Sequence, residues 1–216
     1  MLFSRPKTEL VTPDRALRGR DHYEFAVPDT HFVTGRPIKP PFPEGYQQAV
    51  FGLGCFWGAE EIFWQQPGVW TTAVGYTGGI TAHPDYEEVC SGMTGHTEAV
   101  LVVFDPDETT YGAIVAKFFE VHDPTQGMRQ GNDIGTQYRS GIYYADDDQR
   151  AVAEEAKKVF SEKLEGLGYG RVTTEIAPLS QWYYAEGYHQ QYLAKNPNGY
   201  RCHATTGVSF PLERLA

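Results

Sequence analysis

The residue with the clearest chemical potential is Cys55, which stands between two glycines in the segment Gly-Cys-Phe-Trp-Gly at 54–58. An apolar run ends just before it and a helical pattern starts just after it, so we expect its thiol at the first turn of a helix. The free N–H groups and the positive dipole end of a helix start stabilise a thiolate. The flanking glycines allow a substrate to approach closely. A buried structural cysteine is the alternative interpretation, and the junction favours a nucleophile.

A thiolate alone accounts for little of the rate, so the chemistry also calls for a general acid. Lowering a thiol pKa from about 8.5 to about 6.5 raises the thiolate fraction at pH 7 roughly 24-fold. The accompanying loss of nucleophilicity is about 6- to 10-fold, whereas a general acid supplies about 10²–10⁴. Glu98 stands at the mouth of the most apolar run of the chain. Desolvation there would raise the pKa of its carboxyl toward neutrality. A glutamate in a salt bridge at a strand edge is the alternative.

The elements that must position these residues alternate along the chain. Apolar runs predict strands at 48–54, 69–79, 97–106, 140–145 and 173–179, and glycine ends the first run and breaks the second. Helical spacing, acidic first turns and glycine ends predict helices at 55–68, 111–122 and 146–168. Some neighbouring strands lack a helix between them, which favours an α+β two-layer sandwich over a fully parallel sheet.

The two ends of the chain differ from its centre. Residues 1–46 are rich in proline and lack apolar periodicity, so we interpret them as an extended arm that wraps the domain or frays. Residues 47–216 form the catalytic domain in this interpretation. From about Pro197 its tail is rich in glycine and polar residues, and we expect it to be irregular and mobile.

Composition narrows the classes of partner. The net charge of −10 argues against nucleic acid and anionic membranes as partners. Three cysteines are too few for a secreted disulfide scaffold, so we expect a reducing compartment. No signal peptide and no run of about 18 apolar residues is visible, so a cytoplasmic location is expected.

Six motifs, in order between about residues 47 and 203, resemble the A-type peptide methionine sulfoxide reductases. They are Gly-Cys-Phe-Trp-Gly at 54–58, Gly-Tyr-Thr-Gly-Gly at 75–79, Gly-His-Thr-Glu at 95–98, His-Asp-Pro-Thr-Gln at 122–126, Asn-Asp-Ile-Gly-Thr-Gln-Tyr-Arg-Ser at 132–140 and His-Gln-Gln-Tyr-Leu at 189–193. The resemblance implies an α+β sandwich with a ferredoxin-like core. It also implies reduction of the S epimer of methionine sulfoxide, free or in proteins, without cofactor or metal.

The resemblance assigns roles around the sulfoxide oxygen. It implies that Cys55 attacks the sulfoxide sulfur and that Glu98 protonates the oxygen. Tyr86 and Tyr138 would donate hydrogen bonds to the same oxygen, and Asp133 would order the polar side of the site.

The remaining wall and the resolving thiol follow from the same resemblance. Phe56 and Trp57 would form an apolar wall for the ε-methyl group. Attack leaves a sulfenic acid on the nucleophile, with which Cys202 would condense to a disulfide that thioredoxin or a similar dithiol donor reduces. Neighbouring Arg201 and His203 would favour the Cys202 thiolate. Ser209 stands about where some relatives carry a further cysteine, so a relay of disulfides along the tail is not expected.

Other readings stay open. Cys90 is interpreted as structural. A cysteine hydrolase would pair the nucleophile with His96, His122 or His189 and would not need a second thiol. A peptide-binding module that merely senses oxidants would show no turnover. Zinc on Cys202, His203 and His189 lacks the usual ligand spacing. We expect a monomer, because a repair enzyme must admit varied peptides.

Overall fold

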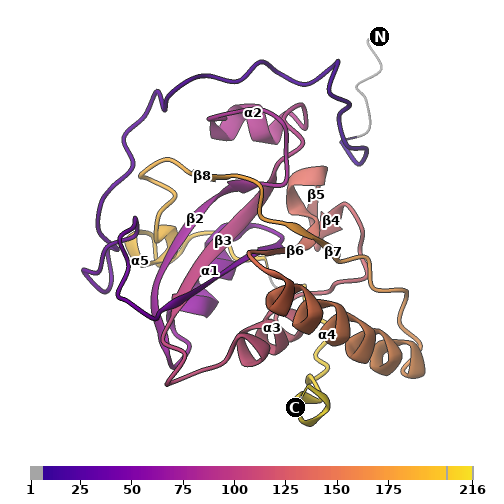
Figure 1. Cartoon of the computed structure of the whole chain (residues 1–216). Coiled ribbons are helices and arrows are strands. Elements are labelled where there is room, and N and C mark those ends of the chain that lie inside the picture. The colour runs from indigo at the N-terminus through magenta and orange to yellow at the C-terminus, as the bar shows by residue number, and fades with distance from the viewer. Residues whose placement is uncertain (1–6, 203, 216) are drawn as a thin grey trace.

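A computed structural model describes residues 7–202 and 204–215. Its main feature is a six-stranded sheet with the order β7-β6-β1-β3-β2-β8 (Figure 1). The strands are β1 (Gln47–Leu53), β2 (Val69–Thr77), β3 (Thr97–Phe104), β6 (Ser140–Tyr144), β7 (Glu175–Pro178) and β8 (Trp182–Tyr184). A small hairpin of β4 (Arg129–Gln130) and β5 (Asp133–Ile134) stands beside the sheet.

The helices begin where side chains can satisfy their free N–H groups. They are α1 (Phe56–Trp64), α2 (Tyr86–Cys90), α3 (Tyr111–Glu120), α4 (Asp147–Gly166) and α5 (Tyr192–Lys195), with 3-10 turns η1 (Thr136–Tyr138) and η2 (Leu212–Arg214). The side chain of Asp146 accepts from Gln149 at the start of α4, as the acidic run predicted. Helix α1 has no acidic residue in its first turn, so the acidic first turn expected for the helix at 55–68 is wrong.

The sheet is mixed, which excludes the fully parallel alternative. β1 pairs antiparallel with β3 and β6, β2 pairs antiparallel with β3 and β8, and only the edge pair β6–β7 is parallel. Strands and helices thus form one mixed fold, in agreement with the predicted class. The ferredoxin-like description of its core stays a prediction.

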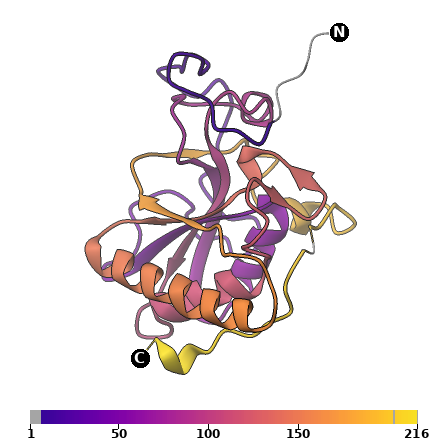
Figure 2. The same ribbon diagram turned by 90° about the vertical axis from the view of Figure 1, so that its right-hand side faces the viewer.

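The two faces of the sheet are covered by different parts of the chain. Phe51 and Val102 point into a large core that also holds Phe63 of α1, Phe118 of α3 and Phe160 of α4. The helices therefore cover one face, with α4 the longest of them (Figure 2).

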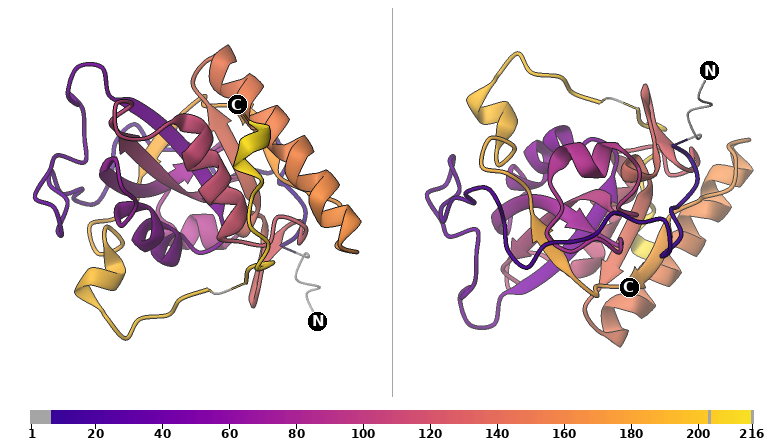
Figure 3. Two further views of the ribbon diagram at one scale, coloured as in Figure 1. Left: turned by 90° about the horizontal axis from the view of Figure 1, so that it is seen from below. Right: turned by 90° about the horizontal axis from the view of Figure 1, so that it is seen from above.

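The alternate residues of the same strands point the other way. Val50, Leu101 and Val103 pack with Ile38 of the N-terminal arm, which is fully buried. Seen from above, the indigo arm also crosses the end of the molecule on which α2 lies (Figure 3). The arm is thus part of the packed structure, because it shields the second face of the sheet.

The tail is irregular up to η2, but it is not a free end. Phe210 is buried and stacks on Phe119 and Phe160, with ring centroids 6.0 and 5.5 Å apart. The tail is therefore packed against the core at this residue, and its expected mobility stays a prediction. No helix in the described ranges is long and apolar enough to cross a membrane.

Candidate active site

The start of α1 places Cys55 at the N-cap position, directly after β1. Gly54 adopts a φ of 95°, and a Cβ there would lie 2.6 Å from the Gln130 side chain. A Cβ on Gly58 would lie 3.8 Å from the carbonyl oxygen of Cys202. The first glycine therefore permits a tight turn, and the second faces the tail. Both glycines thus face other parts of the protein, and the close approach of a substrate that the sequence suggested stays a prediction.

Cys55 is buried, with 8% of the residue exposed. Burial raises its pKa well above the ordinary value, and the nearby carboxyl of Glu98 adds to this effect. The backbone N–H of Trp57 acts in the opposite direction but does not prevail. The expectation that the helix start lowers this pKa is therefore wrong, since desolvation outweighs the helix N–H groups.

Glu98 lies on β3 and is 1% exposed. Burial raises the pKa of its carboxyl to about 8, the backbone N–H of Phe56 opposes the shift, and Asp133 adds to it. That N–H donates to Oε2 at 3.0 Å. Within the described residues no ion pair involves this carboxyl, and its raised pKa agrees with the desolvation expected from the sequence. A pKa of about 8 leaves the protonated form in excess at pH 7, and the role of Glu98 as an acid stays a prediction.

Tyr86 and Tyr138 come from separate segments, α2 and η1. Burial raises the pKa of both hydroxyls, and the charge of Glu98 is the second cause in each case. Both hydroxyls therefore lie within electrostatic reach of the same carboxyl and stay protonated at neutral pH. The backbone N–H of Tyr86 donates to Glu186 Oε1 at 2.7 Å, which fixes the start of its helix.

The first two residues of α1 form an aromatic wall with a distant segment. Phe56 is buried against His189, with ring centroids 5.1 Å apart. Trp57 stacks on Tyr192 at 3.9 Å, and its Nε1–H donates to His189 Nδ1 at 2.9 Å. His189 and Tyr192 were not assigned to this wall from the sequence, although both belong to the motif at 189–193.

Asp133 and the tail meet on the polar side. The hydroxyl of Tyr200 donates to Asp133 Oδ2 at 3.2 Å, and burial raises the pKa of this aspartate. Cys202 is half-buried, and its thiol donates to the carbonyl of Gln130 at 3.4 Å. Electrostatic interactions with Asp133 and Cys202 both contribute to the raised pKa of Cys55. The structure therefore brings the sequence-predicted nucleophile, aspartate and second thiol into one region.

The expected thiolate at Cys202 is not supported by its neighbours. Burial raises the pKa of this thiol. Arg201 instead forms a two-pronged pair with Glu61, at 2.7 and 2.9 Å. His203 lies outside the described residues, as does the zinc site that would need it.

The third cysteine, Cys90, ends α2 and is half-exposed. Burial raises the pKa of its thiol to about 11, and the hydroxyl of Tyr86 opposes the shift through a hydrogen bond. All three cysteines are free thiols in this structure.

The histidines give the hydrolase alternative no support. His96 and His122 hydrogen-bond to backbone carbonyls and a serine hydroxyl, and His189 accepts from an indole N–H. Burial lowers the pKa of His189 to about 3, so it is neutral. Among the hydrogen bonds of the described residues, none joins these rings to Cys55.

A buried thiol at a helix start, near a desolvated carboxyl and two tyrosines, is an arrangement suited to thiol chemistry. Residues 47–210 match the family described as peptide methionine sulfoxide reductase. The chain belongs to this family and is a methionine sulfoxide reductase.

Individual relatives agree with this assignment. A peptide methionine sulfoxide reductase MsrA of Azotobacter vinelandii is 64% identical over 208 residues, which cover 95% of this chain and 96% of the relative. The solved structure of methionine sulfoxide reductase A of Corynebacterium diphtheriae has a TM-score of 0.81 at 46% identity, and covers 93% of this chain and 97% of that one. Mxr1 from Saccharomyces cerevisiae in reduced form gives a TM-score of 0.68 at 33% identity, over 76% and 94%.

Proposed function

We propose that the chain reduces the S epimer of methionine sulfoxide, free and in proteins, through a sulfenic acid on Cys55. The observation that carries this proposal is the hydrogen bond from the Phe56 N–H to Glu98, 3.0 Å long. It ties the helix turn that presents the thiol to the carboxyl that would supply the proton. Nucleophile and acid are thereby held side by side in a buried place.

Both groups hold their protons at neutral pH. Burial raises the pKa of the Cys55 thiol and brings that of Glu98 to about 8. In the proposed step the Cys55 sulfur attacks the sulfoxide sulfur while Glu98 gives its proton to the sulfoxide oxygen. The thiol proton then restores the carboxyl. The bond between the two sulfurs and the sulfur–oxygen bond of the substrate break as the hydroxyl group passes to the Cys55 sulfur, so methionine leaves and Cys–S–OH remains. The cysteine is thereby oxidised by two electrons and the sulfoxide is reduced by two.

The oxygen would sit between the phenols, which act as hydrogen-bond donors. An electrostatic interaction with Glu98 adds to the raised pKa of both Tyr86 and Tyr138, and both hydroxyls remain protonated. Preorganised donors at a developing negative charge need no rearrangement at the moment of reaction. Phe56 and Trp57 would receive the methyl group, and Asp133 would order the polar side of the bound substrate.

The second step would use Cys202. Its thiol attacks the sulfenic sulfur, the proton and hydroxyl leave as water, and a Cys55–Cys202 disulfide remains. A thioredoxin-like dithiol then reduces this disulfide and becomes a disulfide itself. The interaction of Cys55 with Cys202 supports this pairing, because it places the two sulfurs in one region.

The remaining expectations complete the proposal. The enzyme acts as a cytoplasmic monomer, without cofactor or metal. Within the sheet, the order β6-β1-β3-β2 of strands joined as β-α-β-β-α-β supports the ferredoxin-like description.

Single turnover with the separated sulfoxide epimers tests the function. One equivalent of the S epimer should give methionine with the wild type and with Cys202→Ser, and none with Cys55→Ser. The R epimer should stay unreacted. Methionine formed by Cys55→Ser, or equal rates for the two epimers, would contradict the proposal.

A further inference from the structure

The helix that carries Tyr86 is too short to be stable on its own. α2 has five residues, whereas isolated helices shorter than about 12–15 residues are marginal in water. A capping box secures its first turn: Asp85 accepts from the N–H of Glu88, and Glu88 accepts from the N–H of Asp85. This box brings two acidic side chains together at one turn, where a cationic side chain can bind both.

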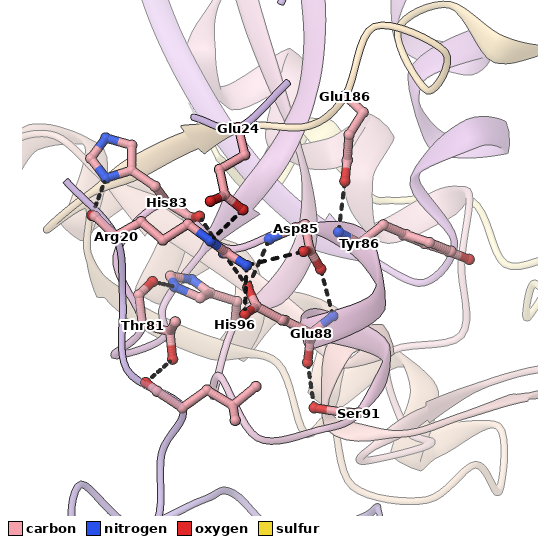
Figure 4. A network of polar contacts seen from close by, with 11 residues as sticks. Arg20, Glu24, Thr81, His83, Asp85, Tyr86, Glu88, Ser91, His96 and Glu186 are labelled. Atoms are coloured by element: carbon pink, nitrogen blue, oxygen red, sulfur yellow. Dashed lines mark hydrogen bonds and ion pairs between the residues drawn. The ribbon is translucent and has the colours of Figure 1, made fainter. Parts of the chain in front are cut away.

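That cation comes from the N-terminal arm. Arg20 forms a bidentate ion pair with Glu88, in which Nη1 donates to Oε2 at 2.6 Å and Nη2 donates to Oε1 at 2.9 Å. Nη2 also reaches Asp85 Oδ2 at 3.3 Å, and Nη1 donates to the carbonyl of His83 at 3.2 Å. One side chain therefore contacts the cap, the third residue of the helix and the segment before it (Figure 4). A planar fork makes such a set of bonds directional.

The backbone around Arg20 is fixed as well. Its N–H donates to the carbonyl of Ala82 at 2.9 Å, and its carbonyl lies 2.8 Å from His83 Nδ1. A Cβ on Gly19 would lie 2.4 Å from the Ala82 nitrogen, so arm and body touch backbone to backbone. The backbone that carries the Arg20 side chain is therefore fixed in position.

The ring of Tyr86 points away from this network (Figure 4). The backbone N–H of Tyr86 donates to Glu186, so both the N-terminal arm and the C-terminal segment bind the start of α2. We propose that Arg20 is a positioning residue for the Tyr86 hydroxyl. This inference rests on the proposed function, in which that hydroxyl donates to the sulfoxide oxygen. Without the guanidinium, Asp85 and Glu88 repel each other and the short helix loses its orientation.

A double-mutant cycle tests this inference in the full-length chain. Arg20→Gln should lower the single-turnover rate of S-sulfoxide reduction by about 10- to 100-fold, because small displacements of a donor are costly. Arg20→Lys keeps the charge but not the fork, and should fall between wild type and Arg20→Gln. In the Tyr86→Phe background, Arg20→Gln should change the rate by less than about twofold. Arg36→Ala is the matched control, because it removes an arm hydrogen bond to the carbonyl of Trp70. Its rate should stay at the wild-type value.

The outcomes separate the two proposals. An unchanged rate in Tyr86→Phe alone would refute the donor role, and with it the inference. A slow Tyr86→Phe combined with an undiminished effect of Arg20→Gln in that background would refute only the inference. Circular dichroism at each step shows whether a variant is folded. If Arg20→Gln is unfolded, Arg20→Lys takes its place in the cycle. If Arg20→Lys then slows the Tyr86→Phe enzyme by the same factor as it slows the wild type, the inference is likewise overturned.

Discussion

Replacing Glu98 by glutamine removes a titration while keeping the shape and the acceptor for the Phe56 N–H. Burial raises the pKa of this carboxyl from 4.5 to about 8. The acid fraction is then about 90% at pH 7 and about 10% at pH 9, by the ordinary titration relation. The single-turnover rate of the wild type should therefore fall nearly tenfold between these pH values. Glu98→Gln should be about 10²–10⁴ slower at pH 7 and should lose this dependence.

The same shift makes a prediction for stability. A carboxyl whose pKa is higher in the folded state binds more protons there, so its contribution to unfolding free energy falls as pH rises between 4.5 and about 8. From pH 5 to pH 8 this linkage amounts to about 3–4 kcal/mol. Glu98→Gln has no such titration, so its stability relative to wild type should rise by that amount over the same range.

Urea unfolding at pH 5 and pH 8 and quenched single turnover from pH 6 to 9 provide the two measurements. A glutamine variant that reduces sulfoxide at the wild-type rate would refute the acid. A stability difference that does not change with pH would refute the desolvation that this reasoning assigns to Glu98.

Three further predictions concern the turn and the tail. Cys202→Ser should release about one methionine per enzyme and then stall with thioredoxin as the reductant. Peptide mapping of the oxidised wild type should find one Cys55–Cys202 disulfide. Full thioredoxin-driven turnover of the variant would contradict the pairing. Gly54→Ala should lower unfolding free energy by about 1–3 kcal/mol, because its φ of 95° is strained for alanine and its Cβ would meet Gln130; denaturant unfolding at wild-type stability would refute this. Phe210→Ala should cost about 3–5 kcal/mol by the same assay, since its ring is buried in the core, and a loss below about 1 kcal/mol would show that the ring is not packed there.

The sequence predicted the elements that carry their own signal. β3 is buried along its whole length and reads as one apolar run, and α4 begins at the acidic cluster around Asp146. α2 escaped prediction because five residues give no helical period, and its cap is completed by Arg20, 65 residues before Asp85 in sequence. The strand β8 has three residues and is defined by pairing with β2, which no local pattern reveals.

The structure brings together side chains that the sequence singled out, whereas the pKa of Cys55 departs from the expected direction. A desolvated acid at Glu98 follows from its apolar neighbours in sequence, and the structure agrees. At Cys55 a local feature, the helix start, suggested a lowered pKa, yet the depth of burial is a tertiary property and decides the direction. The stack of Trp57 on Tyr192 joins residues far apart in the chain, so only the folded structure reveals it.

The burial of Phe210 has a consequence for the chemistry of oxidised cysteine. With Leu193 buried on one side and Phe210 on the other, the stretch that bears Cys202 is tethered at both ends. Such a tether keeps a thiol within a small volume, which corresponds to an effective concentration on the order of millimolar. A sulfenic acid on Cys55 would then meet this thiol sooner than a second molecule of oxidant. The tether would thereby protect the nucleophile from irreversible conversion to sulfinic acid.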